Sequence, residues 1–341
     1  MLRFAHRFGL RSLRRPPLIF LALGFLLVAC TTSGPETTDA TGRKVPRRAT
    51  GQSQVDRGHA LESSGNLDGA LEMFERAIEF NPELTVAYLG AGDIYRKRGD
   101  FQNAESKYAQ AANIEPRNFD AQYLHGLTLQ LLDRLAEAVR AYLRALSIRP
   151  NNLNANLNIA TAYLQLGEPR QALVYGIRAV RIDGENGPAR ANLGAIYAAI
   201  GQHESAVAEY QQAAELMELT PELLLNLADS LSRTGRHEEA INTLGQVIRI
   251  MPNAIAYERL GSAAFRMRDY ETAQESFELA LELNANHYPA INGLAVCRLN
   301  AYVWSGQTDN QSKDEAVRLL RRSLQIEANQ PQIIELLRRY N

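Results

Sequence analysis

The feature that most constrains the fold is a 34-residue period, marked by alanines, that runs through most of the chain. The alanines are Ala70, Ala104, Ala138, Ala172, Ala206 and Ala240, each 34 residues apart, then Ala273 after 33 and Ala316 after 43. Most are followed four residues later by a large residue, namely Phe74, Tyr108, Tyr142, Tyr210, Leu244, Phe277 and Leu320, whereas Gly176 stands beside Tyr175. The first seven alanines are preceded, twelve residues earlier, by Gly58, Gly92, Gly126, Ala160, Gly194, Ala228 and Gly261, and Ala295 fills the matching place in the eighth unit.

This alternation of small and large residues predicts a repeated helical hairpin. Small residues let two antiparallel helices approach closely, and the large residue fills the space that remains between them. Prolines end four of the units, at Pro82, Pro116, Pro150 and Pro252, because proline cannot continue a helix. One hairpin cannot bury its apolar face alone, so successive hairpins must stack and share a continuous core.

These positions resemble the tetratricopeptide repeat, whose signature is the same spacing of small and large residues. The resemblance implies an all-α solenoid, a right-handed superhelix of about eight helical hairpins over residues 51–328, closed by a capping helix at 329–341. The eighth unit departs from the pattern through an insertion near residues 300–312. Ser312 and Glu315 form a capping-box pattern that predicts the start of its second helix. Trp304, the only tryptophan, either packs beneath the insertion or anchors a partner.

The N-terminal segment has the layout of an export signal. Five arginines precede an uncharged apolar run at residues 18–29, which is too short to span a bilayer as a helix and fits the core of a signal peptide. Leu27 to Cys30 then resemble the lipobox of bacterial lipoproteins, which implies cleavage after residue 29 and a lipid on Cys30. Thr31 at the next position implies anchoring at the outer membrane, facing the periplasm. Residues 30–50 are poor in apolar residues and predict a flexible tether.

Composition and motifs exclude several functional classes. Residues after the signal hold 32 basic and 38 acidic residues, because five of the 37 basic residues and none of the 38 acidic ones lie in the first 30. Such a chain lacks the basic excess of a nucleic-acid binder. With Cys30 acylated, Cys297 has no disulfide partner, and its apolar neighbours predict a buried, inert thiol. No phosphate loop, zinc-protease or serine-nucleophile motif occurs, so we expect no enzyme, cofactor or metal site.

A candidate binding site lies on the first helix of each predicted hairpin. In the family that these repeats resemble, first helices line a concave groove, and the residue two before the small position points into it. In three consecutive units that residue is Asn158, Asn192 or Asn226, similar to the asparagine ladder in the repeat domain of O-linked N-acetylglucosamine transferase. An amide pairs with peptide N–H and C=O groups whatever the side chains. Around these asparagines the groove is predicted to include Thr161, Asp229 and Arg233.

The predicted function is therefore that of a membrane-anchored scaffold that binds an extended protein segment. Lipoproteins of this design resemble pilotins of type IV pili and adaptors of cell-wall enzymes, and the sequence favours neither. An alternative is the substrate-recognition subunit of a separate glycosyltransferase-like enzyme. A third hypothesis, a cytosolic chaperone-docking protein, requires that the N-terminal segment is not exported.

Overall fold

A computed structural model describes residues 36–38 and 44–341 of the chain. The predicted signal peptide at residues 1–29 and the predicted lipidation site Cys30 lie outside these residues. Two short strands, β1 (Glu36–Thr38) and β2 (Lys44–Pro46), pair antiparallel and precede α1 (Arg47–Ser63). The described chain is otherwise helical, as α2 (Leu67–Phe80), α3 (Thr85–Lys97), α4 (Phe101–Ile114), α5 (Phe119–Leu131), α6 (Leu135–Ile148), α7 (Leu153–Gln165), α8 (Pro169–Ile182), α9 (Gly187–Ala199), α10 (His203–Leu216), α11 (Pro221–Arg233), α12 (His237–Ile250), α13 (Ala254–Arg266), α14 (Tyr270–Leu283), α15 (Tyr288–Trp304), α16 (Asn310–Ile326) and α17 (Pro331–Tyr340).

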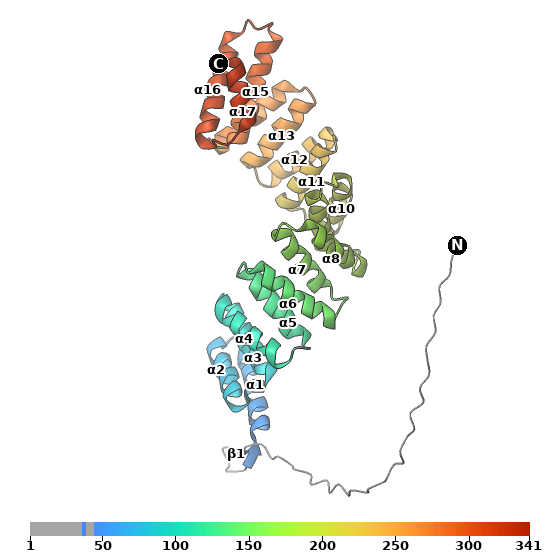
Figure 1. The fold of residues 1–341 in the computed structure, drawn as a ribbon, viewed down its shortest axis with the longest axis vertical. Helices are drawn as coiled ribbons and strands as arrows, with labels where there is room; N and C mark the ends of the chain where they lie inside the picture. The colour runs from blue at the N-terminus through green and yellow to red at the C-terminus, as the bar shows by residue number, and fades with distance from the viewer. Residues whose placement is uncertain (1–35, 39–43) are drawn as a thin grey trace, which may run out of the picture.

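The helices pair into eight hairpins that stack into an elongated solenoid, from α1 at one end to α17 at the other (Figure 1). Each odd-numbered helix up to α15 packs against the helix that follows it, and each hairpin packs against its neighbours. The first helices of consecutive hairpins also contact one another, as α5 does α7 and α11 does α13, more closely than the second helices do within the described chain. The first helices therefore line the inner, concave face. The predicted all-α repeat fold is confirmed.

The small and large positions of the period meet inside each hairpin. The alanines that mark the period are fully buried, and so are the rings of Phe74, Tyr108 and Tyr142. A Cβ added to Gly92 would lie 2.6 Å from the ring of Tyr108, and one added to Gly126 would lie 2.8 Å from the ring of Tyr142. Only glycine lets the aromatic ring lie flat against the first helix, because protein interiors leave little room to yield.

The turn inside each hairpin repeats a left-handed backbone conformation. Glycine stands there in five of the first seven units, with φ between 74° and 82°, at Gly65, Gly99, Gly167, Gly201 and Gly235. Asp133 and Arg268 take the same place in units three and seven, with φ of 58° and 66°. Left-handed backbone disfavours most residues that have a Cβ, although aspartate adopts it occasionally, so the turn at Arg268 carries strain that the glycine turns do not.

The N-terminal boundary of the solenoid differs from the prediction. The tether was expected to extend to residue 50, but α1 begins at Arg47 and β2 lies before it. Arginine and alanine are good helix formers, so the first helix includes residues 47–49 and begins directly after Pro46. No helix in the described part of the chain is both long and apolar enough to cross a membrane.

The insertion in the eighth unit lengthens both helices and also the loop between them, which spans residues 305–309 where the seventh unit has 267–269. Helices α15 and α16 each span 17 residues, whereas α13 spans 13 and α14 spans 14. The predicted capping residue is wrong. Asp309, not Ser312, caps α16, because its Oδ1 accepts a hydrogen bond from the Ser312 backbone N–H at 3.1 Å, and Ser312 Oγ donates to Asp309 Oδ2 at 2.6 Å.

The last helix, α17, closes the core as predicted for a capping helix. Ile333 is buried against Ala295, Leu299, Ala316 and Leu320 of the eighth hairpin, and Leu336, Leu337 and Tyr340 pack around them. Arg338 and Arg339 lie exposed in its last turn. A terminal repeat needs this polar outer surface because no further hairpin covers it.

Candidate protein-binding groove

The asparagine positions of the concave face connect neighbouring first helices. Asn158 on α7 donates from Nδ2 to Tyr123 Oη on α5 at 3.1 Å, and Asn192 on α9 donates to Thr161 Oγ1 on α7 at 2.8 Å. Arg259, at the matching position of α13, donates from Nη1 to the carbonyl of Leu225 on α11 at 2.9 Å. The side chain at this position thus reaches back across the concave face to the preceding repeat.

The sequence-predicted site residues therefore fall into two groups. Asn158, Thr161 and Asn192 are half-buried, and each takes part in a bond between adjacent repeats. Asn226 on α11 is exposed, and Asp229 and Arg233 on the same helix form an ion pair with Nε and Oδ2 2.8 Å apart. Asn192 Oδ1 is buried without a hydrogen-bond partner. Asn158 and Asn192 of the predicted ladder thus hold adjacent repeats together, a structural role that sequence reasoning missed.

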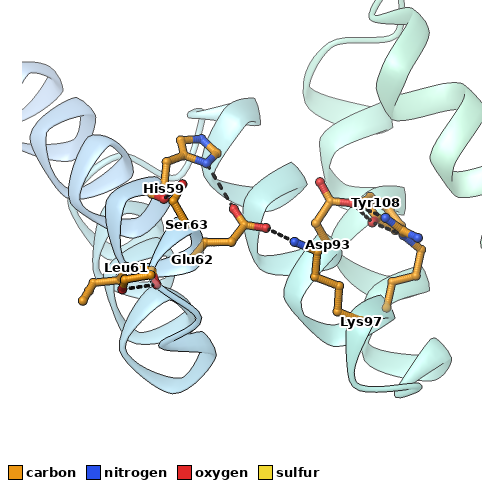
Figure 2. Close-up of polar contacts among 9 residues, drawn as sticks. His59, Leu61, Glu62, Ser63, Asp93, Lys97 and Tyr108 are labelled. Atoms are coloured by element: carbon orange, nitrogen blue, oxygen red, sulfur yellow. Dashed lines mark hydrogen bonds and ion pairs between the residues drawn. The ribbon is translucent and has the colours of Figure 1, made fainter.

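Polar side chains also bridge the first helices at the N-terminal end of the solenoid. Lys97 on α3 pairs with Glu62 on α1, with Nζ and Oε1 2.6 Å apart, and His59 approaches the other carboxylate oxygen at 3.4 Å (Figure 2). Burial would raise the pKa of Glu62, but the hydrogen bonds from Lys97 and His59 lower it below its ordinary value. These side chains occupy the concave face of the first two units with contacts inside the chain.

Tyr108 and Asp93 belong to a separate polar cluster in the second hairpin. The Tyr108 hydroxyl donates to Asp93 Oδ1 at 2.7 Å, and Arg96 pairs with the same carboxylate at 3.1 Å (Figure 2). Burial of the ring, together with the neighbouring Asp93 carboxylate, raises the pKa of Tyr108 above its ordinary value. The ring is held at its edge and by its hydroxyl, so it has little freedom to move.

The concave face opens into a cleft between α11 and α13. The cleft measures about 570 Å³, and Asp229, Arg233, Arg259, Ser262 and Arg266 are among its lining residues. Asp229 and Arg233 form an ion pair in its lining, and Glu258 accepts a hydrogen bond from Ser262 Oγ at 2.9 Å. The predicted groove residues Asp229 and Arg233 therefore lie in a real hollow, which is mixed in charge.

A larger and more apolar cleft of about 820 Å³ lies beside this one, toward the C-terminus. Ser262 and Arg266 line both clefts, so the two adjoin at these residues. Its apolar lining comes from Phe265 on α13, Phe277 on α14, Val296 on α15, and Ile333 and Leu336 on α17.

Asn292 and Gly293 shape this apolar cleft. Asn292 Nδ2 donates to Gln330 Oε1 at 2.7 Å, and Asn292 Oδ1 is buried without a partner. Gly293 holds the ladder position of the eighth unit, and a Cβ there would lie 2.3 Å from the Phe277 ring. The absence of a side chain at Gly293 lets the buried Phe277 ring pack directly against α15, where the ring forms part of the cleft lining. Sequence reasoning missed this cleft, and the glycine at the ladder position is not a specific signal for it, because Gly90 holds the same position in the second unit.

Two further sequence predictions concern the eighth unit. Cys297 is buried, as predicted, and burial raises the pKa of its thiol to about 11. Trp304 does not pack beneath the insertion, because 73% of its surface is exposed. Among the residues that the structure describes, no three His, Cys, Asp or Glu side chains are placed to hold a metal ion.

The fold and the groove define a helical-repeat solenoid of the kind that presents a concave surface to other molecules. Sequence models of the tetratricopeptide repeat match residues 55–115, 89–152, 188–253 and 254–287. The chain belongs to the tetratricopeptide repeat family.

Solved structures with the same fold include other repeat proteins. A tetratricopeptide repeat protein from Parabacteroides merdae is 18% identical, with a TM-score of 0.52 over 73% of this chain and 99% of that one. PilF of Pseudomonas aeruginosa is 18% identical, with a TM-score of 0.54 over 63% and 98% of the two chains. PilW, described as a widely conserved type IV pilus biogenesis factor, is 21% identical, with a TM-score of 0.52 over 62% and 97%. At this identity the likeness concerns the fold alone.

Proposed function

We propose that this protein is a membrane-anchored scaffold whose concave groove binds an extended segment of a partner protein. The observation that carries the proposal is a pair of adjoining clefts along α11, α13, α15 and α17, one of them mixed polar and the other apolar. Binding sites have this composition, because apolar walls supply affinity and a few polar groups fix orientation.

The segment would continue from these clefts along the asparagine ladder. Asn226 is exposed and presents its amide without giving up an internal bond, whereas Asn158 and Asn192 would have to share theirs. Thr161, Asp229 and Arg233 would line the same path. A groove of this kind recognises backbone together with small apolar side chains, and the charges at Asp229 and Arg233 add selectivity.

The test compares partner capture by variants of the groove, using detergent-solubilised membranes and mass spectrometry. Ser262→Tyr places a ring at the junction of the two clefts and should abolish capture, whereas Gln212→Tyr, exposed on the second helix α10, should leave it unchanged. Asn226→Ala removes one hydrogen bond and should weaken capture about two- to thirteenfold, from 0.5–1.5 kcal/mol per bond. Both groove variants should melt as the wild type does. Undiminished capture by Ser262→Tyr with an intact fold would place the binding surface elsewhere.

The anchoring part of the proposal rests on the sequence of the first 30 residues. Cys30 would be acylated after cleavage, and the protein would face the periplasm from the outer membrane as part of a cell-envelope assembly, of the pilus type or as an adaptor of cell-wall enzymes. Acyl chains bind membranes through buried methylenes rather than charge, so attachment should survive a high-salt wash. Cys30→Ser should yield an unacylated protein. A mature wild-type protein whose N-terminus is not Cys30, read by mass spectrometry, would refute the anchor.

A further inference from the structure

The eighth hairpin carries a second surface, outside the concave groove. Helix α15 has four residues more than α13 and so ends about one turn later. The extra turn ends in Val303 and Trp304, and Trp304 is the most exposed of the large hydrophobic side chains in the described chain. An indole that a protein leaves in water on a rigid helix end is typical of an interface anchor, because tryptophan is enriched among the residues that dominate binding energies.

A cleft of about 560 Å³ lies beside this indole, between α14 and the last turns of α15. Tyr270 and Trp304 contribute its aromatic groups, and Cys297 and Ala301 lie between them on the α15 side. The α14 side is lined by Glu271, Gln274, Glu275 and Glu278. Residues spaced by four share one face of a helix, so Glu271 with Glu275 and Gln274 with Glu278 form two rows along the hollow. The oxygens of the second row accept hydrogen bonds from Arg298, Gln274 Oε1 at 3.1 Å and Glu278 Oε1 at 3.3 Å.

The charge of this cleft is negative and only partly neutralised. Arg298 is the nearby cation, and its guanidinium lies 3.3 Å from Glu278 and 3.2 Å from Glu315. Glu271 and Glu275 are exposed, and neither has an ion pair within 4.0 Å among the described residues. The cleft thus offers two carboxylates that no cation of the described chain neutralises.

The indole is fixed in place beside these carboxylates. Trp304 Nε1 donates to Asn300 Oδ1 at 3.2 Å, one turn earlier on the same helix, and Asn300 also lines the cleft. This bond ties the polar edge of the indole to α15. A ring held in this way loses little conformational entropy when a ligand stacks on it.

We propose that this cleft binds an arginine-rich segment of a partner protein. A guanidinium stacks on the face of an indole and donates in a planar fork to carboxylates, and the cleft places both kinds of group around one hollow. The negative charge of the lining selects a basic segment over an acidic one. The site lies between α14 and α15, so it can be filled while the concave groove holds another segment. This proposal does not depend on the proposed groove function.

The test uses the full-length chain in detergent and a fluorescein-labelled peptide of alternating arginine and glycine. Trp304 is the only tryptophan, so its intrinsic emission reports on this cleft alone, and an unlabelled copy of the peptide should change that emission in a saturable way. An alternating glutamate–glycine peptide of equal length should not. A basic peptide that binds by fluorescence polarisation without changing the emission of Trp304 would overturn the proposal.

Substitutions on the surface separate the two kinds of contact. Trp304→Leu keeps an apolar side chain but removes the cation–π contact, and should weaken peptide binding about three- to thirtyfold. Glu271→Gln combined with Glu275→Gln should weaken it about two- to tenfold, and less at high salt. Glu282→Gln, on an exposed glutamate of α14 that does not line the cleft, is the matched control and should bind as the wild type does. Equal affinities for all four proteins would overturn the assignment.

Discussion

The packing of glycine against an aromatic ring inside each hairpin makes a quantitative prediction at Gly92. A Cβ at Gly92 would lie 2.6 Å from Tyr108 Cε1 and 2.9 Å from Cδ1 and Cζ, well inside the contact distance of two carbons. The ring is fully buried, and its hydroxyl is held by Asp93 at 2.7 Å. Gly92→Ala therefore overpacks a rigid site, which costs about 1–3 kcal/mol.

Gly245→Ala is the matched control for this substitution. Gly245 lies inside α12, and an added Cβ there would meet only Arg249 Nη1, at 3.7 Å. Alanine is a better helix former than glycine by about 1 kcal/mol, and this gain is common to both sites. Gly245→Ala should therefore stabilise the protein, and the two variants should differ by about 1–3 kcal/mol in free energy of unfolding.

Urea unfolding followed by circular dichroism measures this difference, with the transitions fitted to a nearest-neighbour scheme because repeat arrays are not strictly two-state. Tyr108→Ala removes the ring, so in that background Gly92→Ala should become stabilising, as Gly245→Ala is. If Gly92→Ala stabilises the wild-type chain as much as Gly245→Ala does, glycine is not required at residue 92 to make room for the Tyr108 ring, and the packing argument is refuted.

Three further predictions follow from single residues. Arg268→Gly should raise the free energy of unfolding by about 0.5–1.5 kcal/mol in urea titrations, because Arg268 holds a left-handed φ of 66°. An unchanged or lower stability would mean that this turn is not strained. Burial lowers the pKa of His125 despite its contact with Glu105, so the unfolded chain takes up the proton first as the pH drops. The free energy of unfolding of the wild type should therefore fall more steeply between about pH 7 and 5 than that of His125→Gln, and parallel pH profiles would contradict this. In a Cys30→Ser chain, Cys297 should react with a thiol reagent at pH 8 roughly a hundredfold more slowly in the folded protein than in denaturant, because burial raises the pKa of its thiol to about 11. Equal rates in the two states would show that the thiol is not buried.

Sequence patterns predict the repeats well because each patterned residue makes a contact within or between adjacent hairpins. Ala206 is fully buried, and Gly194 contacts the ring of Tyr210 sixteen residues later in the same unit. Only small residues fit beside the ring, so few side chains are possible at these positions. The same small residues therefore recur in unit after unit, and the pattern can be recognised in the sequence.

The groove was harder to predict because it depends on how the hairpins are placed relative to one another. The distance from Asn158 to Tyr123, or from Asn192 to Thr161, is set by the angle between successive first helices, which no single unit specifies. The apolar cleft forms only because α17 brings Ile333 and Leu336 next to Phe265 of α13. Capping by Asp309 instead of Ser312 is a local choice between two good capping residues.

The central claim, that the concave face holds a partner segment, is tested most directly by site-specific photo-crosslinking in cells. A photoreactive amino acid is placed at Ser232, which lines the cleft between α11 and α13, and in a separate chain at Gln212 on the second helix α10. The groove account predicts that Ser232 yields a discrete adduct with one envelope protein, that Gln212 does not, and that Ser262→Tyr abolishes the adduct. A discrete adduct from Gln212 together with none from Ser232 would contradict the account.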